Sequence, residues 1–199
     1  MLRRSLAVAL AAALAVLVLV PVALAARVSV RVEGRTQTIF APAPRLVDAQ
    51  HALQALELAS VAGEFYYHLA SSSFGPYVDQ IGRFPAAGGS GWVFKVNGAS
   101  PPVGADKVEL KDGDTVLWYW ADFDPNTFAG PPTLDLRREG ACYRVWRHDD
   151  QGRRTAAAGA TLHYDGKRAA AQNGRVCLPR HISLVRATLT GTVRSNAVR

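Results

Sequence analysis

The hydrophobic pattern at the start of the chain predicts two strands followed by a helix. Valine alternates with polar residues over Arg27–Glu33 (RVSVRVE), and this period of two is typical of a half-buried β-strand. Gly34 indicates a turn, and Arg35–Phe40 is predicted as the returning strand. Beyond two prolines, apolar residues recur at helical spacing, which predicts a helix over Ala49–Ser60 with Asp48 as its N-cap.

The next part of the chain returns to strand-like patterns. An Asn97-Gly98 pair indicates a tight hairpin turn, because both residues tolerate positive φ, and Asp112-Gly113-Asp114 indicates another turn. This order of elements predicts an α+β fold, a β-grasp-like sheet with one helix across one face. The strands expected here are Phe65–Leu69, Trp92–Val96, Lys107–Leu110 and Thr115–Trp120.

The last third of the chain has no helical pattern. Its short alternating runs are separated by turn pairs such as Asp165-Gly166 and Asn173-Gly174. We therefore expect an all-β part, a small immunoglobulin-like β-sandwich. The predicted strands are Leu134–Arg138, Cys142–His148, Thr161–Tyr164, Arg175–Leu178, Ser183–Leu189 and Thr192–Val198.

The first 25 residues have the pattern of a secretory signal peptide. Arg3 and Arg4 precede the apolar run Leu6–Val20, and the small residues of Ala23-Leu24-Ala25 follow Pro21. We expect an exported protein that works outside the cytoplasm, whether secreted, periplasmic or at the cell surface. The alternative is an uncleaved membrane anchor, and a membrane is a predicted partner only in that case.

Residues 124–132 (DPNTFAGPP) divide the rest of the chain into two predicted domains. The first module is residues 26–123 and the second module is residues 133–199, with residues 124–132 as the linker. The charge differs between the two sides. The chain carries +7 overall, but residues 26–130 hold 8 basic and 11 acidic residues, whereas residues 131–199 hold 13 basic and 5 acidic ones. Such asymmetry indicates modules with different surfaces.

A charge of +7 first suggests a nucleic-acid partner, but export argues against DNA or RNA. Residues 131–199 could instead bind an anionic envelope component or a protein partner. The alternative is a basic face that is only solvated. Cys142 and Cys177 lie in two of the predicted strands of this module, and an oxidising compartment would allow a disulfide between them. Two free thiols remain the other interpretation.

Two motifs in the first module resemble a known family. The run Gly91–Gly98 (GWVFKVNG), then Gly104 and Leu110–Tyr119 (LKDGDTVLWY), are similar to the C-terminal domain of transcobalamin-like proteins. That domain also occurs as a domain of unknown function in exported bacterial proteins. The resemblance covers roughly Arg27–Asp122 and implies a β-grasp fold with cobalamin as a candidate ligand. In the carriers a helical domain holds the other side of the corrin ring, and this sequence has no such pattern.

The second module resembles immunoglobulin-like or carboxypeptidase-regulatory-like sandwiches less closely, at Ala158–Thr161, Asn173–Val176 and Val193–Val198.

For the first module, the candidate ligand-binding residues are aromatic. Trp118 and Trp120 share one face of a strand and Tyr119 the other, while Trp92 lies on a neighbouring strand. An exposed platform of these rings could bind a flat ligand or a glycan. Alternatively, the tryptophans are core beneath the helix and Tyr119 is a single surface ring.

The spacing of reactive and metal-ligating residues gives little support for an enzyme or a metal site. No nucleophile motif or phosphate-binding loop is present, and we predict a non-enzymatic binding module, or alternatively a purely structural surface or adhesion module. No metal-ligand spacing supports the histidines, and solvated turns explain them as well. The acidic loop lacks the order of a calcium site, and capping of backbone amides is the alternative. The residues considered were His148, Asp149, Asp150, His163 and His181 for a metal ion, and Asp106, Glu109, Asp112 and Asp114 for calcium.

Overall fold

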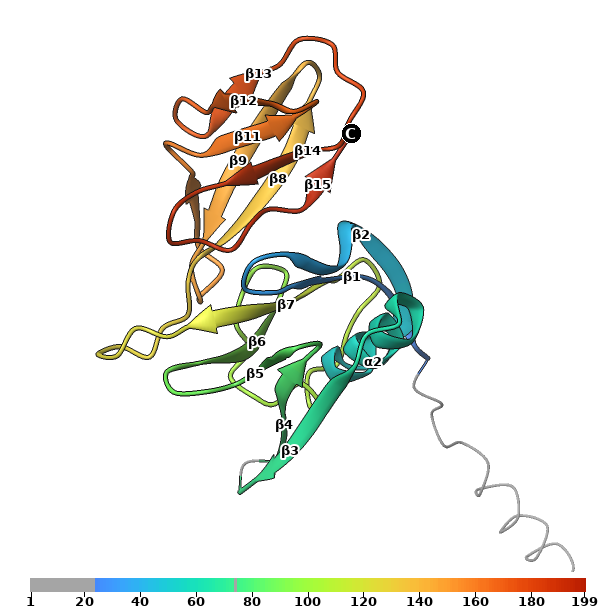
Figure 1. The fold of residues 1–199 in the computed structure, drawn as a ribbon. Helices are drawn as coiled ribbons and strands as arrows, with labels where there is room; N and C mark the ends of the chain where they lie inside the picture. The colour runs from blue at the N-terminus through green and yellow to red at the C-terminus, as the bar shows by residue number, and fades with distance from the viewer. Residues whose placement is uncertain (1–23, 74) are drawn as a thin grey trace, which may run out of the picture.

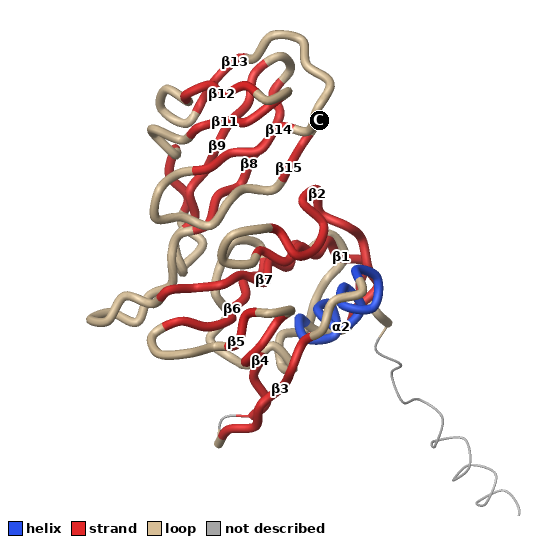
Figure 2. The backbone as a smooth tube through the Cα atoms, in the orientation of Figure 1, coloured by secondary structure: helices blue, strands red, loops and turns tan. Residues whose placement is uncertain are grey.

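The computed structural model describes residues 24–73 and 75–199 of the chain. Almost all of the predicted signal peptide lies outside these residues. The described chain is mostly β, with a single helix and several sheets (Figures 1 and 2). Within the described part, no helix is both long and apolar enough to cross a membrane.

The first module is built on a four-stranded sheet in the order β2-β1-β7-β6. β1 and β7 run parallel, and the other neighbours are antiparallel. The predicted Asn97-Gly98 turn is confirmed, because both residues have positive φ directly after β6. The strands of this sheet are β1 (Ala26–Glu33), β2 (Thr38–Ala49), β6 (Ser90–Val96) and β7 (Thr115–Asp122).

The helix α2 (Ala52–Gly63) begins three residues later than predicted, and Asp48 is not its N-cap. Asp48 lies in β2, and the cap is His51, whose Nδ1 accepts a hydrogen bond from the Gln54 amide at 3.1 Å. β2 continues through both prolines because it is an edge strand, where a missing N–H costs no ladder hydrogen bond. The helix packs its alanines and Leu56 against the valines of β1, and these side chains are fully buried.

A three-stranded sheet in the order β3-β4-β5 completes the first module, with β4 beside β6. Its β3–β4 hairpin projects from the body of the module in Figure 1. The strand predicted at Lys107–Leu110 is wrong, because this segment forms only an isolated bridge between Glu109 and His51. The bounds are β3 (Tyr67–Ser72), β4 (Gly75–Ile81) and β5 (Phe84–Pro85).

The second module consists of two sheets packed on a common core. In one sheet β9 pairs with β8 on one edge and with β10 and β13 on the other, and the second sheet has the order β12-β11-β14-β15. Leu134, Leu136, Tyr143, Val145 and Leu162 are buried between them. The strands are β8 (Thr133–Glu139), β9 (Cys142–His148), β10 (Arg154–Ala156), β11 (Thr161–Tyr164), β12 (Lys167–Ala170), β13 (Arg175–Cys177), β14 (Val185–Thr188) and β15 (Ala197–Val198).

Cys142 and Cys177 form a disulfide, which confirms the bridged interpretation. The two cysteines are direct partners across the β9–β13 pair. The bridge therefore fastens β13, a strand of three residues, to the longer β9.

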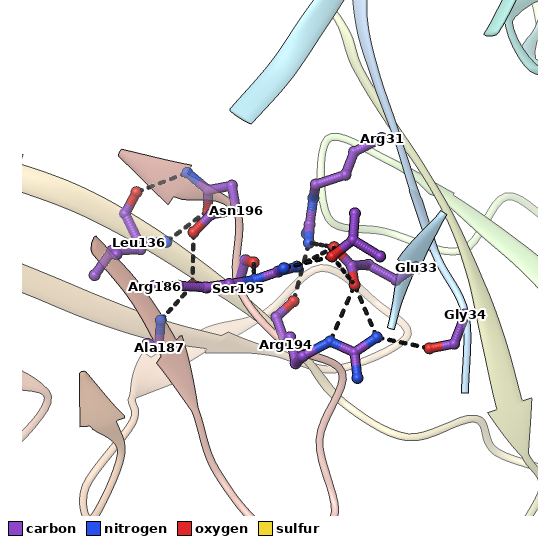
Figure 3. Close-up of polar contacts among 10 residues, drawn as sticks. Arg31, Glu33, Gly34, Leu136, Arg186, Ala187, Arg194, Ser195 and Asn196 are labelled. Carbon is purple, nitrogen blue, oxygen red and sulfur yellow. Dashed lines mark hydrogen bonds and ion pairs between the residues drawn. The ribbon is translucent and has the colours of Figure 1, made fainter. Parts of the chain in front are cut away.

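The second module covers the face of the first sheet that points away from α2. Glu33 on this face is fully buried and forms ion pairs with Arg31 and with Arg186 and Arg194 of the second module (Figure 3). The Arg194 Nη2 atom lies 3.0 Å from Glu33 Oε2. The polar side of β1, which the alternating pattern assigns to solvent, is thus part of the contact between the modules.

Candidate ligand-binding cleft

The four aromatic residues proposed from the sequence do not form an exposed platform. Trp92, Trp118 and Tyr119 are 7%, 2% and 1% exposed, and Trp120 is half-buried. The alternative is right that the tryptophans belong to the core, because Trp118 is buried with the helix residues and Trp120 packs against them, but it is wrong that Tyr119 is a surface ring. Tyr119 packs with Ala121 and with Val193 of the second module, because that module covers this side of β7.

Three of these rings line one cleft of about 300 Å³. Trp92 comes from β6, and Trp118 and Tyr119 come from β7. Trp120 does not reach this cleft; it lines a wider groove of about 630 Å³ beside the linker. The cleft is bounded by the β6 edge of the sheet, by β4 and by residues of the segment 123–130.

The aromatic walls of the cleft are held by ring contacts and by one buried hydrogen bond. Phe94 stacks on Trp118 with ring centroids 5.0 Å apart and an interplanar angle of 27°. The Trp118 indole Nε1–H donates to the Ala52 carbonyl at 3.2 Å. This bond ties the ring to the first turn of α2 and fixes its orientation.

The cleft also contains two exposed aromatic residues that we did not propose from the sequence. Tyr77 of β4 is 51% exposed and Phe128 of the linker is 78% exposed. Large exposed rings beside a cleft are available to a ligand without unfolding the core. In the sequence, Tyr77 lies in a run rich in glycine and aromatic residues at 74–84, and residues 77–81 fit the transcobalamin-like pattern, whereas Phe128 lies in a segment without periodicity.

Polar groups from both modules meet at the Asp150 carboxylate, which lines the cleft together with Ser100 and Gly130. The Asp150 carboxylate lies 3.2 Å from Lys95 Nζ, accepts a hydrogen bond from Ser100 Oγ at 3.3 Å and accepts another from the Gly130 amide at 3.2 Å. Lys95 is fully buried and also donates to the Asp149 carbonyl at 2.8 Å. The cleft is therefore lined mainly by apolar side chains together with the hydrogen-bonded Asp150 carboxylate, whereas Lys95 lines a separate cavity of about 320 Å³.

Burial sets the protonation of the groups around this carboxylate. It raises the pKa of Tyr119 above its ordinary value, and the Asp150 charge raises it further, so the phenol stays neutral at physiological pH. Burial lowers the pKa of Lys95, and the attraction of Asp150 opposes this effect. The buried Tyr119 phenol beside the carboxylate therefore keeps its proton, and the Ser100 hydroxyl donates to Asp150.

The histidines and aspartates considered for a metal ion are dispersed. His148 packs on Gly98 of the hairpin turn, and His163 and His181 bond to Thr188 and Tyr143 respectively. Among the described residues, no group of three or more His, Cys, Asp or Glu side chains is arranged to hold a metal ion.

The acidic loop considered for calcium uses two of its carboxylates within the fold. Asp112 accepts a hydrogen bond from the Arg27 amide at 2.7 Å, and Asp114 accepts from the Lys111 amide at 2.8 Å. Asp114 also accepts from the Asn97 side chain at 2.7 Å. These bonds join the loop to β1 and to the hairpin turn.

Residues 49–122 match the model of one protein family, described as a domain of unknown function, DUF4430. This segment includes α2 and most of the cleft. A comparison with the curated proteins finds no match. Among solved structures, the chain is similar to a protein of Ruminococcus gnavus described as a candidate metal-binding protein. The identity is 17%, the TM-score is 0.39, and the match covers 50% of this chain and 99% of the other.

Proposed function

We infer that the chain is a non-enzymatic binding protein whose first module takes a small, flat, largely apolar ligand. The observation that carries this proposal is the cleft of about 300 Å³, whose lining includes Trp92, Trp118 and the Asp150 carboxylate. Ligand sites are concave and mostly apolar, with a few polar groups that fix orientation. The match to a domain of unknown function is compatible with such a role.

The volume of the cleft supports a ligand of one or two rings. It lies at the lower end of the range of about 300–1,000 Å³ that holds drug-sized ligands. Cobalamin, the candidate ligand from the transcobalamin resemblance, is much larger and could insert only an edge or a side group. Cobalamin is therefore one member of the test panel rather than the leading ligand.

We place this function outside the cytoplasm. The Cys142–Cys177 disulfide supports an oxidising compartment, and the sequence pattern of residues 1–25 supports export. We also propose that the first module is a β-grasp domain, supported by its mixed four-stranded sheet with α2 on one face. An immunoglobulin-like relationship for the second module is supported by its two packed sheets.

Tryptophan fluorescence of the purified protein tests the proposal. The panel contains cobalamin, haem, smaller planar ring compounds and neutral oligosaccharides. We expect a small planar compound to change the fluorescence at micromolar concentration. Tyr77→Ala and Phe128→Ala should each weaken its binding about two- to tenfold, since one aromatic contact contributes about 0.5–1.5 kcal/mol.

Tyr66→Ala is the matched control for these variants. Tyr66 is 59% exposed and does not line the cleft, so its loss should leave binding unchanged. The proposal fails if no compound in the panel binds, or if the control weakens binding as much as the cleft variants do.

A purely structural surface module is the second candidate. The near-complete burial of Trp118 and Tyr119 favours it, because rings in contact with the core stabilise the fold whether or not a ligand binds. Titrations without a response for every compound would support this alternative.

A further inference from the structure

Three arginines form a row across one sheet of the second module. Arg144 of β9 is the direct partner of Arg137 on β8 and of Arg175 on β13. Neighbouring strands lie about 4.8 Å apart, and like charges directly opposite each other destabilise a sheet. Such a row needs compensating negative charge.

The chain supplies this compensation only in part. Glu139 lies 3.7 Å from Arg144 and 3.8 Å from Arg175, and Asp135 lies 3.1 Å from Arg137. Within the described residues, the Arg144 Nε atom is buried and has no hydrogen-bond partner. This Nε atom is the one that lies 3.7 Å from Glu139 Oε1, so the ion pair lacks a hydrogen bond, and Arg144 shares Glu139 with Arg175.

A tryptophan next to the row extends it into a larger basic face. The ring of Trp146 lies on the same side of β9, with the guanidinium carbon of Arg144 5.4 Å and that of Arg154 4.9 Å from its centroid. Cation–π contacts of this kind hold long side chains in extended positions. Arg154 forms no ion pair with any described residue, and four arginines thus share this face with the carboxylates Asp135 and Glu139.

The disulfide lies two residues from the row on both strands. Cys142 precedes Arg144 by two positions on β9, and Cys177 follows Arg175 by two positions on β13. The bridge keeps the two arginines in register against their mutual repulsion. The side chains of the three arginines in the row are 30% exposed for Arg144, 48% for Arg175 and 65% for Arg137.

We propose that this basic face binds an extended polymer that carries repeating phosphodiester groups. The face is the surface of a sheet: Arg137 and Asp135 also line the cavity of about 320 Å³, but Trp146, Arg144, Arg154 and Arg175 line none of the three cavities of about 300, 320 and 630 Å³. A flat surface with spaced charges suits a polymer better than a small molecule. The two free oxygens of a phosphodiester can accept hydrogen bonds from guanidinium groups on neighbouring strands, and arginine is well suited to phosphate recognition.

Binding of poly(glycerol phosphate) to the full chain tests this proposal, with polygalacturonate and neutral dextran as comparison polymers. We expect binding that weakens as salt rises, because the contacts are between exposed charges. Arg144→Gln/Arg175→Gln should raise the dissociation constant at least about tenfold. Lys167→Gln/Arg168→Gln removes the same charge from β12 in the other sheet and should change binding less than twofold.

Thermal unfolding of the same variants separates binding from folding. Because the row consists of like charges, Arg144→Gln/Arg175→Gln should leave the melting temperature unchanged or raise it. The proposal is overturned if poly(glycerol phosphate) does not bind, if polygalacturonate or dextran binds more tightly, or if the β12 variant loses as much affinity. A lower melting temperature of the row variant would assign these arginines a structural role instead. These outcomes are independent of the ligand of the aromatic cleft.

Discussion

Glu33 is the residue on which the contact between the two modules centres. Its carboxylate is fully buried and accepts from Arg31, Arg186, Arg194 and the Thr38 hydroxyl. Removing one member of a buried ion-pair cluster leaves the other charges uncompensated, which costs much more than losing an exposed pair. The stability of the contact therefore depends on this one carboxylate.

Glu33→Gln should lower the free energy of unfolding by about 3–5 kcal/mol, because three arginines lose their counter-charge. Chemical denaturation measures the change. Glu57→Gln on the exposed side of α2 is the control and should change stability by less than about 0.5 kcal/mol. Equal effects of the two substitutions would contradict the burial described for Glu33.

His148 gives the protein a stability that depends on pH. Burial lowers its pKa below 6.5; Asp135 opposes the shift, and Lys95, Arg154 and Arg137 add to it. The unfolded state therefore binds more protons below about pH 6.5, so the free energy of unfolding should fall as the pH decreases through this range. The pKa of His163 is also lowered by burial, and its effect has the same sign.

Denaturation at a series of pH values between about 7 and 5 checks this dependence. The slope should be smaller in His148→Asn and smallest in His148→Asn/His163→Asn. Aspartates with lowered pKa values, such as Asp122, lose their contribution to the free energy of unfolding only at pH values below 3.8. They therefore do not affect the slope measured between about pH 7 and 5. An unchanged slope in the double variant would contradict the assignment.

At the scale of elements, the strength of the sequence pattern decided which predictions succeeded. β9 and β11 have the predicted bounds because alternating large apolar residues define them. β10 and β12 were missed because RTA and KRAA contain no such alternation. β2 was predicted too short, since a proline excludes only a central strand and the pattern does not reveal which strand lies at the edge.

The same reasoning explains what could be predicted of the cleft. Trp92, Trp118 and Tyr119 were identified because aromatic residues at strand positions are few and conspicuous. Phe128 was not, because a loop has no period from which its direction could be inferred. The polar part of the lining depends on Asp150, which contacts Lys95 from another module, and local patterns do not encode such distant contacts.

The β9–β13 pair gives a prediction at this scale. A bridge across 35 residues contributes about 4 kcal/mol in the chain-entropy description. Cys142→Ser/Cys177→Ser should therefore lower the free energy of unfolding by roughly 3–4 kcal/mol, measured by denaturation against the oxidised protein. Addition of a reductant should then have no further effect on the variant, and a variant as stable as the oxidised protein would contradict this role of the bridge.

At the scale of the whole molecule, the arginines of the second module lie in two places, the contact between the modules and the outer face of one sheet. Arg186 and Arg194 are directed at Glu33 in the contact between the modules, whereas Arg144 and Arg175 lie on the outer face. The net charge of the sequence could not reveal this division, because it depends on which strand face each arginine occupies.

The shared contact also predicts how the molecule unfolds. Both modules bury side chains against each other, including Glu33, Lys95 and Tyr119 of the first. We expect one cooperative transition in calorimetry, since separation would expose these groups. Two well-separated transitions in the intact chain would show that the contact contributes little.

The central claim is that the chain binds a flat ligand in the aromatic cleft and a phosphodiester polymer on the basic face. The ¹H–¹⁵N spectrum of its four tryptophan indoles tests both parts in one measurement. A planar compound that binds should shift the Trp92 and Trp118 signals and leave that of Trp146 unchanged, and poly(glycerol phosphate) should shift only the Trp146 signal. Indole signals that do not respond to either partner, or that all move together, would contradict the account.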